Sequence, residues 1–157
     1  PRSVTSTGKQ QWTEQGATAQ SKLDDQAQSS VCFVQGCIHG VSIKFLIDTG
    51  SSVTILHPHM WEMMPLSIRQ NMKPWEQSIV AAEGSCLEVI GCTDVIVGLG
   101  KLRRRHQVVV APITQAGILG LDFLSMNGGV LDLPRRKLRF DSVEVPIISE
   151  GLTFTCC

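Results

Sequence analysis

The sequence predicts an all-β domain with a short helix near its C-terminal end. Three observations support this fold class. Short runs rich in Val, Ile and Leu recur along the chain and alternate with glycine-bearing turns. Glycine in His39-Gly40 and in Glu83-Gly84-Ser85 suits the hairpin turns expected between such runs. Gly128-Gly129 closes residues 121–127, which are expected to form the helix.

Length and composition limit the class of protein. A chain of 157 residues with 43% hydrophobic residues suits one domain with tails. The net charge of +0 gives no electrostatic reason to expect nucleic acid or an anionic membrane as a partner. No apolar run reaches the ~18 residues of a membrane helix, and no secretory signal pattern opens the chain. We therefore expect no nucleic-acid partner, no membrane partner, and a cytoplasmic location.

The domain is expected to span residues 31–148. Residues 1–30 are rich in Gln, Ser and Thr and hold few apolar side chains. Such a segment buries too little surface to offset its chain entropy, so we predict a disordered linker. Residues 149–157 are predicted to be a C-terminal tail.

The cysteines do not show the spacing of a zinc site. The first four, which we expect to be reduced thiols mostly on strands, are Cys32, Cys37, Cys86 and Cys92. His57 and His59 are two residues apart and do not share a helix face, so a capping residue and a surface residue are expected. We predict no metal and no cofactor.

The N-terminal half of the domain is organised around residues 45–55. Residues 31–38 and 41–47 predict a hairpin whose second strand delivers Asp48 to a tight loop. Residues 52–56 predict the next strand, and residues 57–64 a short helix with Pro58 in its first turn. A carboxylate between two apolar strands is costly to bury without hydrogen bonds. Asp48 is therefore either held by a structural network or used for chemistry.

The middle of the chain predicts two hairpins after a polar connection over residues 67–74. Residues 78–82 and 86–90 flank the glycine-bearing tip at 83–85. Residues 93–99 and 107–111 are expected to be strands. Between them, the basic run from Lys101 to His106 lacks aromatic platforms, so we expect a solvated strand edge.

Residues 116–124 are the second informative stretch. Ile118-Leu119-Gly120 leads into the predicted helix, and Asp122 stands where an acid favours the helix dipole. Asp122 lacks the Thr-Gly that follows Asp48, so we expect a structural role for it. Residues 130–133 and 137–140 predict strands across a turn, and residues 143–148 a last strand.

These motifs resemble those of the retropepsins, the proteases of retroviruses and LTR retroelements. The resemblance is carried by Phe-Leu-Ile-Asp-Thr-Gly-Ser at 45–51, the hairpin at about 79–90 and Ile-Leu-Gly at 118–120. Residues 56–61 and 98–102 look especially like retroelement proteases and their domesticated cellular relatives. The resemblance implies a single-lobe retropepsin-like acid protease fold with a flap hairpin and one short C-terminal helix.

The resemblance also implies a set of site residues. By resemblance the catalytic residues are Asp48, Thr49 and Gly50, and the substrate-binding residues are Ser51, Ala82, Glu83, Gly84, Ser85 and Ile118. Val53, Ile79 and Val80 are further candidates for the apolar substrate pockets. Many viral members carry alanine where Ser51 stands. The Ser51 hydroxyl is hypothesised to donate to the Asp48 carboxylate and lower the working pH.

The number of catalytic acids predicts the oligomeric state. Aspartic proteases use two carboxylates that share a proton and activate water, and no other aspartate here is followed by Thr-Gly or Ser-Gly. A homodimer would supply the second Asp48, and the resemblance implies that Thr49 hydrogen-bonds across the two-fold axis. The function implied is an aspartic endopeptidase that cleaves a Gag-Pol-type polyprotein and itself, in the cytoplasm or inside virus-like particles.

Two alternatives stay open at this point. The chain is consistent with a domesticated cellular protease that acts on a host protein. It is also consistent with a dimeric scaffold that kept the fold and lost activity, although the intact Asp48-Thr49-Gly50 argues against this.

Overall fold

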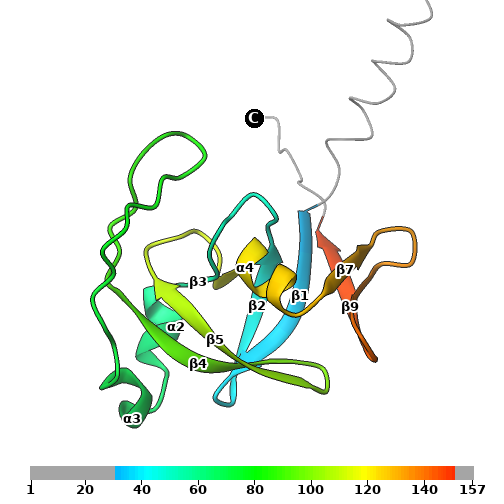
Figure 1. The fold of residues 1–157 in the computed structure, drawn as a ribbon, viewed down its shortest axis with the longest axis horizontal. Coiled ribbons are helices and arrows are strands. Elements are labelled where there is room, and N and C mark those ends of the chain that lie inside the picture. The colour runs from blue at the N-terminus through cyan, green and yellow to red at the C-terminus, as the bar shows by residue number, and fades with distance from the viewer. Residues whose placement is uncertain (1–30, 151–157) are drawn as a thin grey trace, which may run out of the picture. The chain divides into compact units, whose positions relative to one another are not determined.

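Nine strands and three short helices make up residues 31–150, the part of the chain that the computed structural model describes (Figure 1). The strands are β1 (Val31–Ile38), β2 (Val41–Ile47), β3 (Ile55–Leu56), β4 (Gly91–Leu99), β5 (Leu102–Val110), β6 (Gly117–Leu119), β7 (Gly129–Asp132), β8 (Lys137–Phe140) and β9 (Val143–Glu150). The helices are α2 (Pro58–Glu62), α3 (Leu66–Arg69) and α4 (Leu121–Met126). The mostly-β class confirms the predicted fold class.

Six of these strands close into a barrel. Their order is β2-β6-β3-β5-β4-β1, and β1 pairs back onto β2. The strands β1 and β2 form one antiparallel hairpin, and β4 and β5 form the other along their whole length. The three-residue strand β6 runs parallel to β2 and antiparallel to β3. The short strands β3 and β6 therefore join the two hairpins, and β6 pairs with the end of β2 at Ile47.

The turns follow local rules that are visible in the sequence. His39 and Gly40 have φ values of 47° and 81°. Two consecutive residues with positive φ are the signature of the type I′ turn that matches strand twist. The predicted hairpin over residues 31–47 is confirmed with the predicted bounds.

The barrel interior is apolar, and helix α4 contributes Phe123 and Leu124 to it. Phe45, Phe123 and Phe140 are among the largest fully buried side chains. The rings of Phe123 and Phe140 meet edge to face, with centroids 5.8 Å apart, a favourable arrangement of their quadrupoles. The strands β7, β8 and β9 form an antiparallel meander that contributes Leu138 and Val145 to the same core.

Some predicted boundaries differ from the structure. Residues 52–54 are not strand, because Thr54 uses its backbone N–H to bond a side chain instead of a ladder. The predicted connection over residues 67–74 is partly helical, because α3 begins after its N-cap Pro65. Arg69 Nε donates to the carbonyl of Met64 at 3.1 Å. The last strand extends to Glu150, two residues past the expected domain boundary. The predicted linker at 1–30 and residues 151–157 of the tail predicted at 149–157 lie outside the described residues.

Candidate active site

Asp48 lies at the first position after β2, in a loop fixed by its own backbone and side chain. Its N–H donates to the carbonyl of Leu119 at 3.1 Å, and its carbonyl accepts from the N–H of Ser51 at 3.2 Å. Its Oδ1 accepts from the N–H of Gly50 at 2.9 Å. A Cβ on Gly50 would lie 3.1 Å from that same Oδ1, so a side chain there would crowd the carboxylate.

A second chain segment crosses directly beneath this loop. The N–H of Leu121 donates to the carbonyl of Ser51 at 2.8 Å. A Cβ on Gly120 would fall onto the backbone carbonyl of Val53, so the two segments can approach this closely only with glycine here. The motif residues around Asp48 and Gly120, about 70 positions apart in the chain, are therefore one structural unit.

Asp122 holds this unit from below. Its Oδ1 accepts hydrogen bonds from Thr54 Oγ1 and from the N–H of Phe123, both at 2.7 Å. Its Oδ2 accepts from the N–H of Thr54 at 3.2 Å and from His106 Nε2 at 2.8 Å. Thr54 Oγ1 also accepts from the N–H of Gly120 at 3.1 Å. We call Thr54, His106 and Asp122 the supporting triad; its geometry agrees with the structural role expected for Asp122.

The hydrogen bonds of the supporting triad favour the ionised form of the Asp122 carboxyl group. Burial opposes the charge of Asp122 and on its own would raise the pKa. The hydrogen bonds from His106, Thr54 and the Phe123 N–H, together with the charge of His106, outweigh burial and set the pKa of Asp122 below its ordinary value. Asp122 is therefore a structural anion within the hydrogen-bonded base of the Asp48 loop.

His106 corrects the interpretation of the basic run. Arg103, Arg104 and Arg105 are exposed on β5 as expected, but His106 is only 6% exposed. Its ring packs edge to face on Phe123 with centroids 5.1 Å apart. Alternation along β5 places His106 on the same face as Leu102 and Val108, which are both buried. This period-of-two signal was present in the sequence and identifies His106 as a core residue.

The expected flap is a hairpin with few regular ladder bonds. The N–H of Gly84 donates to the carbonyl of Ala81 at 2.9 Å, and the N–H of Ala81 donates to the carbonyl of Ser85 at 2.8 Å. Gly84 has φ +94°, which identifies a three-residue loop that ends in a glycine bulge. Figure 1 shows this hairpin, in green between α3 and β4, extending away from the barrel.

A cleft of about 730 Å³ lies between this hairpin and the Asp48 loop. The predicted site residues that line it are Asp48, Gly50, Ser51, Ile79, Val80, Ala82, Glu83 and Ile118. Gly84, Ser85 and Val53 are not among its lining residues, although the first two shape the tip above it. Sequence reasoning missed the loop Pro112-Ile113-Thr114-Gln115, which forms one wall. The apolar Ile113 within this polar loop was the available signal.

Thr49 faces a different hollow from Asp48. It lines a depression of about 330 Å³ together with Leu121, Leu131 and residues of α4. Leu121 is 46% exposed and Leu131 is 36% exposed. The Asp-Thr-Gly loop thus presents its acid to the cleft and its threonine to a partly apolar surface.

The Ser51 hydroxyl does not bond the Asp48 carboxylate in this structure. This hydroxyl donates to the carbonyl of Val53 at 2.7 Å and so stabilises the loop.

Ser51→Ala should therefore lower the free energy of unfolding by about 1 kcal/mol, the usual value of such a bond. The acid limb of a pH–rate profile should stay unchanged. A shifted acid limb in the variant would restore the original hypothesis of a hydroxyl bonded to the carboxylate.

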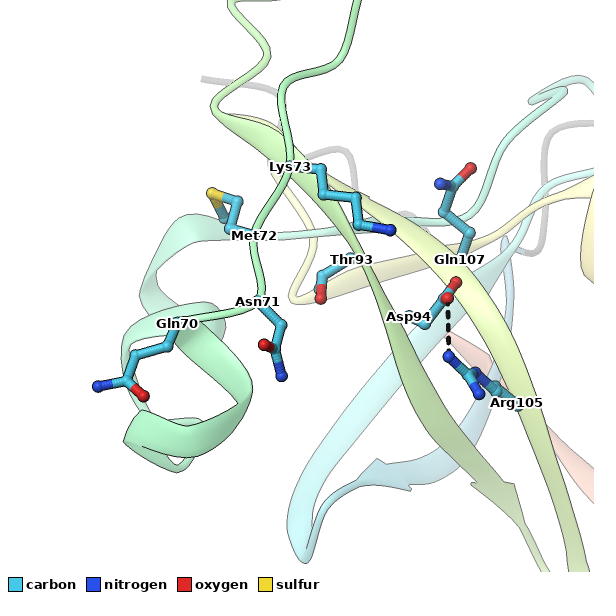
Figure 2. Close-up of a pocket in the computed structure, with 8 residues that line it drawn as sticks. All are labelled: Gln70, Asn71, Met72, Lys73, Thr93, Asp94, Arg105 and Gln107. Carbon is cyan, nitrogen blue, oxygen red and sulfur yellow. Dashed lines mark hydrogen bonds and ion pairs between the residues drawn. The ribbon is translucent and has the colours of Figure 1, made fainter.

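Other surface features lie apart from the Asp48 cleft. A polar hollow of about 440 Å³ is lined by residues 70–73 and by side chains of β4 and β5. Arg105 pairs there with Asp94 at 3.1 Å, and Figure 2 shows this pair. Within residues 31–150, no group of three or more His, Cys, Asp or Glu side chains is placed to hold a metal ion. Cys32, Cys37, Cys86 and Cys92 are free thiols.

No helix of the described part is long and apolar enough to cross a membrane.

Comparison with known proteins decides the family. Residues 34–126 match the family model described as "gag-polyprotein putative aspartyl protease". The chain belongs to this family, the retropepsin-like aspartic proteases. The matched range contains the Asp48 loop, the hairpin with its tip at residues 82–84, and α4.

Solved structures show the same fold. The crystal structure of the retroviral protease-like domain of Ddi1 from Leishmania major superposes with a TM-score of 0.64 at 22% identity, covering 76% of this chain and 94% of that domain. EIAV protease complexed with the inhibitor HBY-793 gives a TM-score of 0.53 at 22% identity, covering 64% and 91%. The expected retropepsin-like fold is confirmed by both.

Proposed function

We propose that this protein is a homodimeric aspartic endopeptidase whose reaction centre contains one Asp48 from each protomer. The observation that carries the proposal is the position of Asp48 in a cleft that is lined both by the Asp48 loop and by the hairpin at residues 79–87. Among residues 31–150, Asp48 is the only aspartate that lines this cleft. A second copy of the chain supplies the second carboxylate that the chemistry requires.

The surface beside Asp48 supports this association. Thr49 lines a hollow with the exposed leucines Leu121 and Leu131, and Met126 on α4 is 75% exposed. Removing such side chains from water favours contact with a second apolar surface. A two-fold axis beside Thr49 would bring the two Asp48 loops together while their carboxylates still face the cleft.

The chemistry follows from two neighbouring carboxylates that cannot both ionise cheaply. One carboxylate takes a proton from water, and the water oxygen adds to the scissile carbonyl. The other carboxyl gives its proton to the carbonyl oxygen. Collapse of the gem-diol breaks the C–N bond as a proton passes to the leaving nitrogen. The substrate lies extended between flap and floor, where backbone groups of the hairpin pair with it as an added strand.

The biological substrate proposed is a Gag-Pol-type polyprotein that includes the protease itself, processed in the cytoplasm or inside virus-like particles. A cellular substrate is the second candidate. It is favoured by the likeness in fold to a domain of Ddi1 from Leishmania major, which is not a viral source.

The test of the proposed function is cleavage that depends on protein concentration. Specific activity should fall as the protein is diluted through its dimer dissociation constant, since the reaction centre exists only in the dimer. A pepstatin-type inhibitor should stop cleavage, and a serine-protease inhibitor should not. Sedimentation velocity over the same dilution series measures the dimer fraction. Cleavage whose specific activity stays constant while the dimer dissociates would contradict the two-chain reaction centre.

A further inference from the structure

Glu83 is a charged residue at the tip of the flap. It is the middle residue of the loop Ala82-Glu83-Gly84 and lines the same cleft as Asp48. Its side chain is exposed. The walls of this cleft include the apolar residues Leu46, Ile55 and Ile118, so Glu83 places a carboxylate among mainly apolar neighbours.

The carboxylate of Glu83 is held in a defined orientation. Ser85 Oγ donates to Glu83 Oε1 at 2.6 Å across the glycine bulge. This hydroxyl, together with the backbone N–H of Glu83 itself, lowers the pKa of Glu83 below its ordinary value. Glu83 therefore stays ionised further into the acidic range than a free glutamate.

The charge of Glu83 has no cationic partner among residues 31–150. None of the residues that line the cleft is Lys, Arg or His. The ion pairs of the described residues involve Asp94, Asp122, Asp132 and Glu144 instead. The residues that line the cleft therefore include the carboxyl groups of Asp48 and Glu83 and no basic side chain.

We propose that Glu83 selects peptide substrates that carry a lysine or arginine close to the scissile bond. This inference rests on the proposed function and names the substrate class of the same cleft. A substrate strand beneath the flap brings a long basic side chain within reach of Glu83, and Lys and Arg can extend along apolar surface to place their charge at its rim. Closing the flap removes water from the pair and strengthens the attraction.

The experiment uses a fluorogenic octapeptide with a central Leu-Phe bond and alanine at the flanking positions. Each flanking position is replaced in turn by lysine, by norleucine, which has a similar apolar length, or by glutamate. For the wild-type dimer at about 0.1 M salt, kcat/KM at one or two positions should be at least about threefold higher for lysine than for norleucine, the scale of an exposed ion pair. Glutamate at those positions should be the poorest substrate, and about 0.5 M salt should reduce the preference.

Three variants separate charge from hairpin shape. Glu83→Gln keeps a partner for Ser85 and removes the charge, so the ratio of kcat/KM for lysine peptides to that for norleucine peptides should lose the preference for lysine. Ser85→Ala keeps the charge and should keep the preference. Glu88→Gln removes the same charge from an exposed residue of the flap that does not line the cleft, and it should match the wild type.

The outcomes are distinct. A preference for lysine that survives in Glu83→Gln would overturn the inference and leave the proposed function standing. Equal acceleration of all peptides by Glu83→Gln would also overturn it, because the carboxylate would then be acting only on flap closure. Failure of the wild-type dimer to cut every peptide in the series would overturn the proposed function and this inference with it.

Discussion

Asp48→Asn should reduce kcat by at least about 10³-fold, within the range expected for the loss of general acid–base catalysis. The asparagine side chain keeps an oxygen that can accept the Gly50 N–H now bonded to Asp48 Oδ1 at 2.9 Å. The loop should therefore keep its shape, and the amide should fail only as a proton acceptor and donor. The measurement is cleavage of a peptide by wild type and variant under conditions in which both are dimers.

The control for this prediction must show that folding and association survive. Sedimentation velocity should give the same dimer dissociation constant for Asp48→Asn as for the wild type, since Asp48 faces the cleft and Thr49 faces the other hollow. Asp141→Asn is a matched change at an exposed turn with φ 46°, a conformation that asparagine tolerates. It should leave cleavage unaltered. Cleavage by Asp48→Asn at the wild-type rate would remove the catalytic assignment.

The local parts of the fold were predictable because their determinants lie next to one another in the chain. His39-Gly40 fixes a two-residue turn, and the apolar runs on both sides then set strands that end where they were predicted to end. The tip of the flap was likewise predictable from Gly84. The loop of Asp48 followed from an apolar strand that ends in Asp-Thr-Gly. In each case, a few residues adjacent in the sequence determine the local backbone conformation.

The contacts below the loop were not predictable in the same way. Thr54 and Asp122 are hydrogen-bonded across 68 positions of sequence, and His106 reaches Asp122 from another strand. Three arginines in front of His106 suggested a solvated edge and masked the alternation that buries it. Residues 52–54 were predicted as strand from side-chain type, but the Thr54 N–H bonds Asp122, and only the Thr54 carbonyl bonds the neighbouring strand, through the N–H of Val109.

Asp122→Ala should lower the free energy of unfolding by about 3 kcal/mol, because breaking a buried pair leaves its partners unsatisfied. The His106 ring, whose side chain is 4% exposed, would lose its carboxylate. Thr54 and the N–H of Phe123 would lose an acceptor at 2.7 Å. Chemical denaturation at fixed protein concentration measures the change. Asp122→Asn keeps an oxygen for Thr54 and should cost about half as much.

The same carboxylate makes a signed contribution to pH-dependent stability. The pKa of Asp122 is lower in the folded chain than its ordinary value. Its stabilising contribution is therefore complete above an unfolded pKa of about 3.9 and is lost as the pH falls through the lower folded value. The difference in unfolding free energy between wild type and Asp122→Asn should be constant from about pH 6 down to about pH 5 and should shrink below about pH 4. A difference that grows on acidification would mean that Asp122 is bound as a neutral acid, and that the hydrogen bonds from His106 and Thr54 do not support a charge.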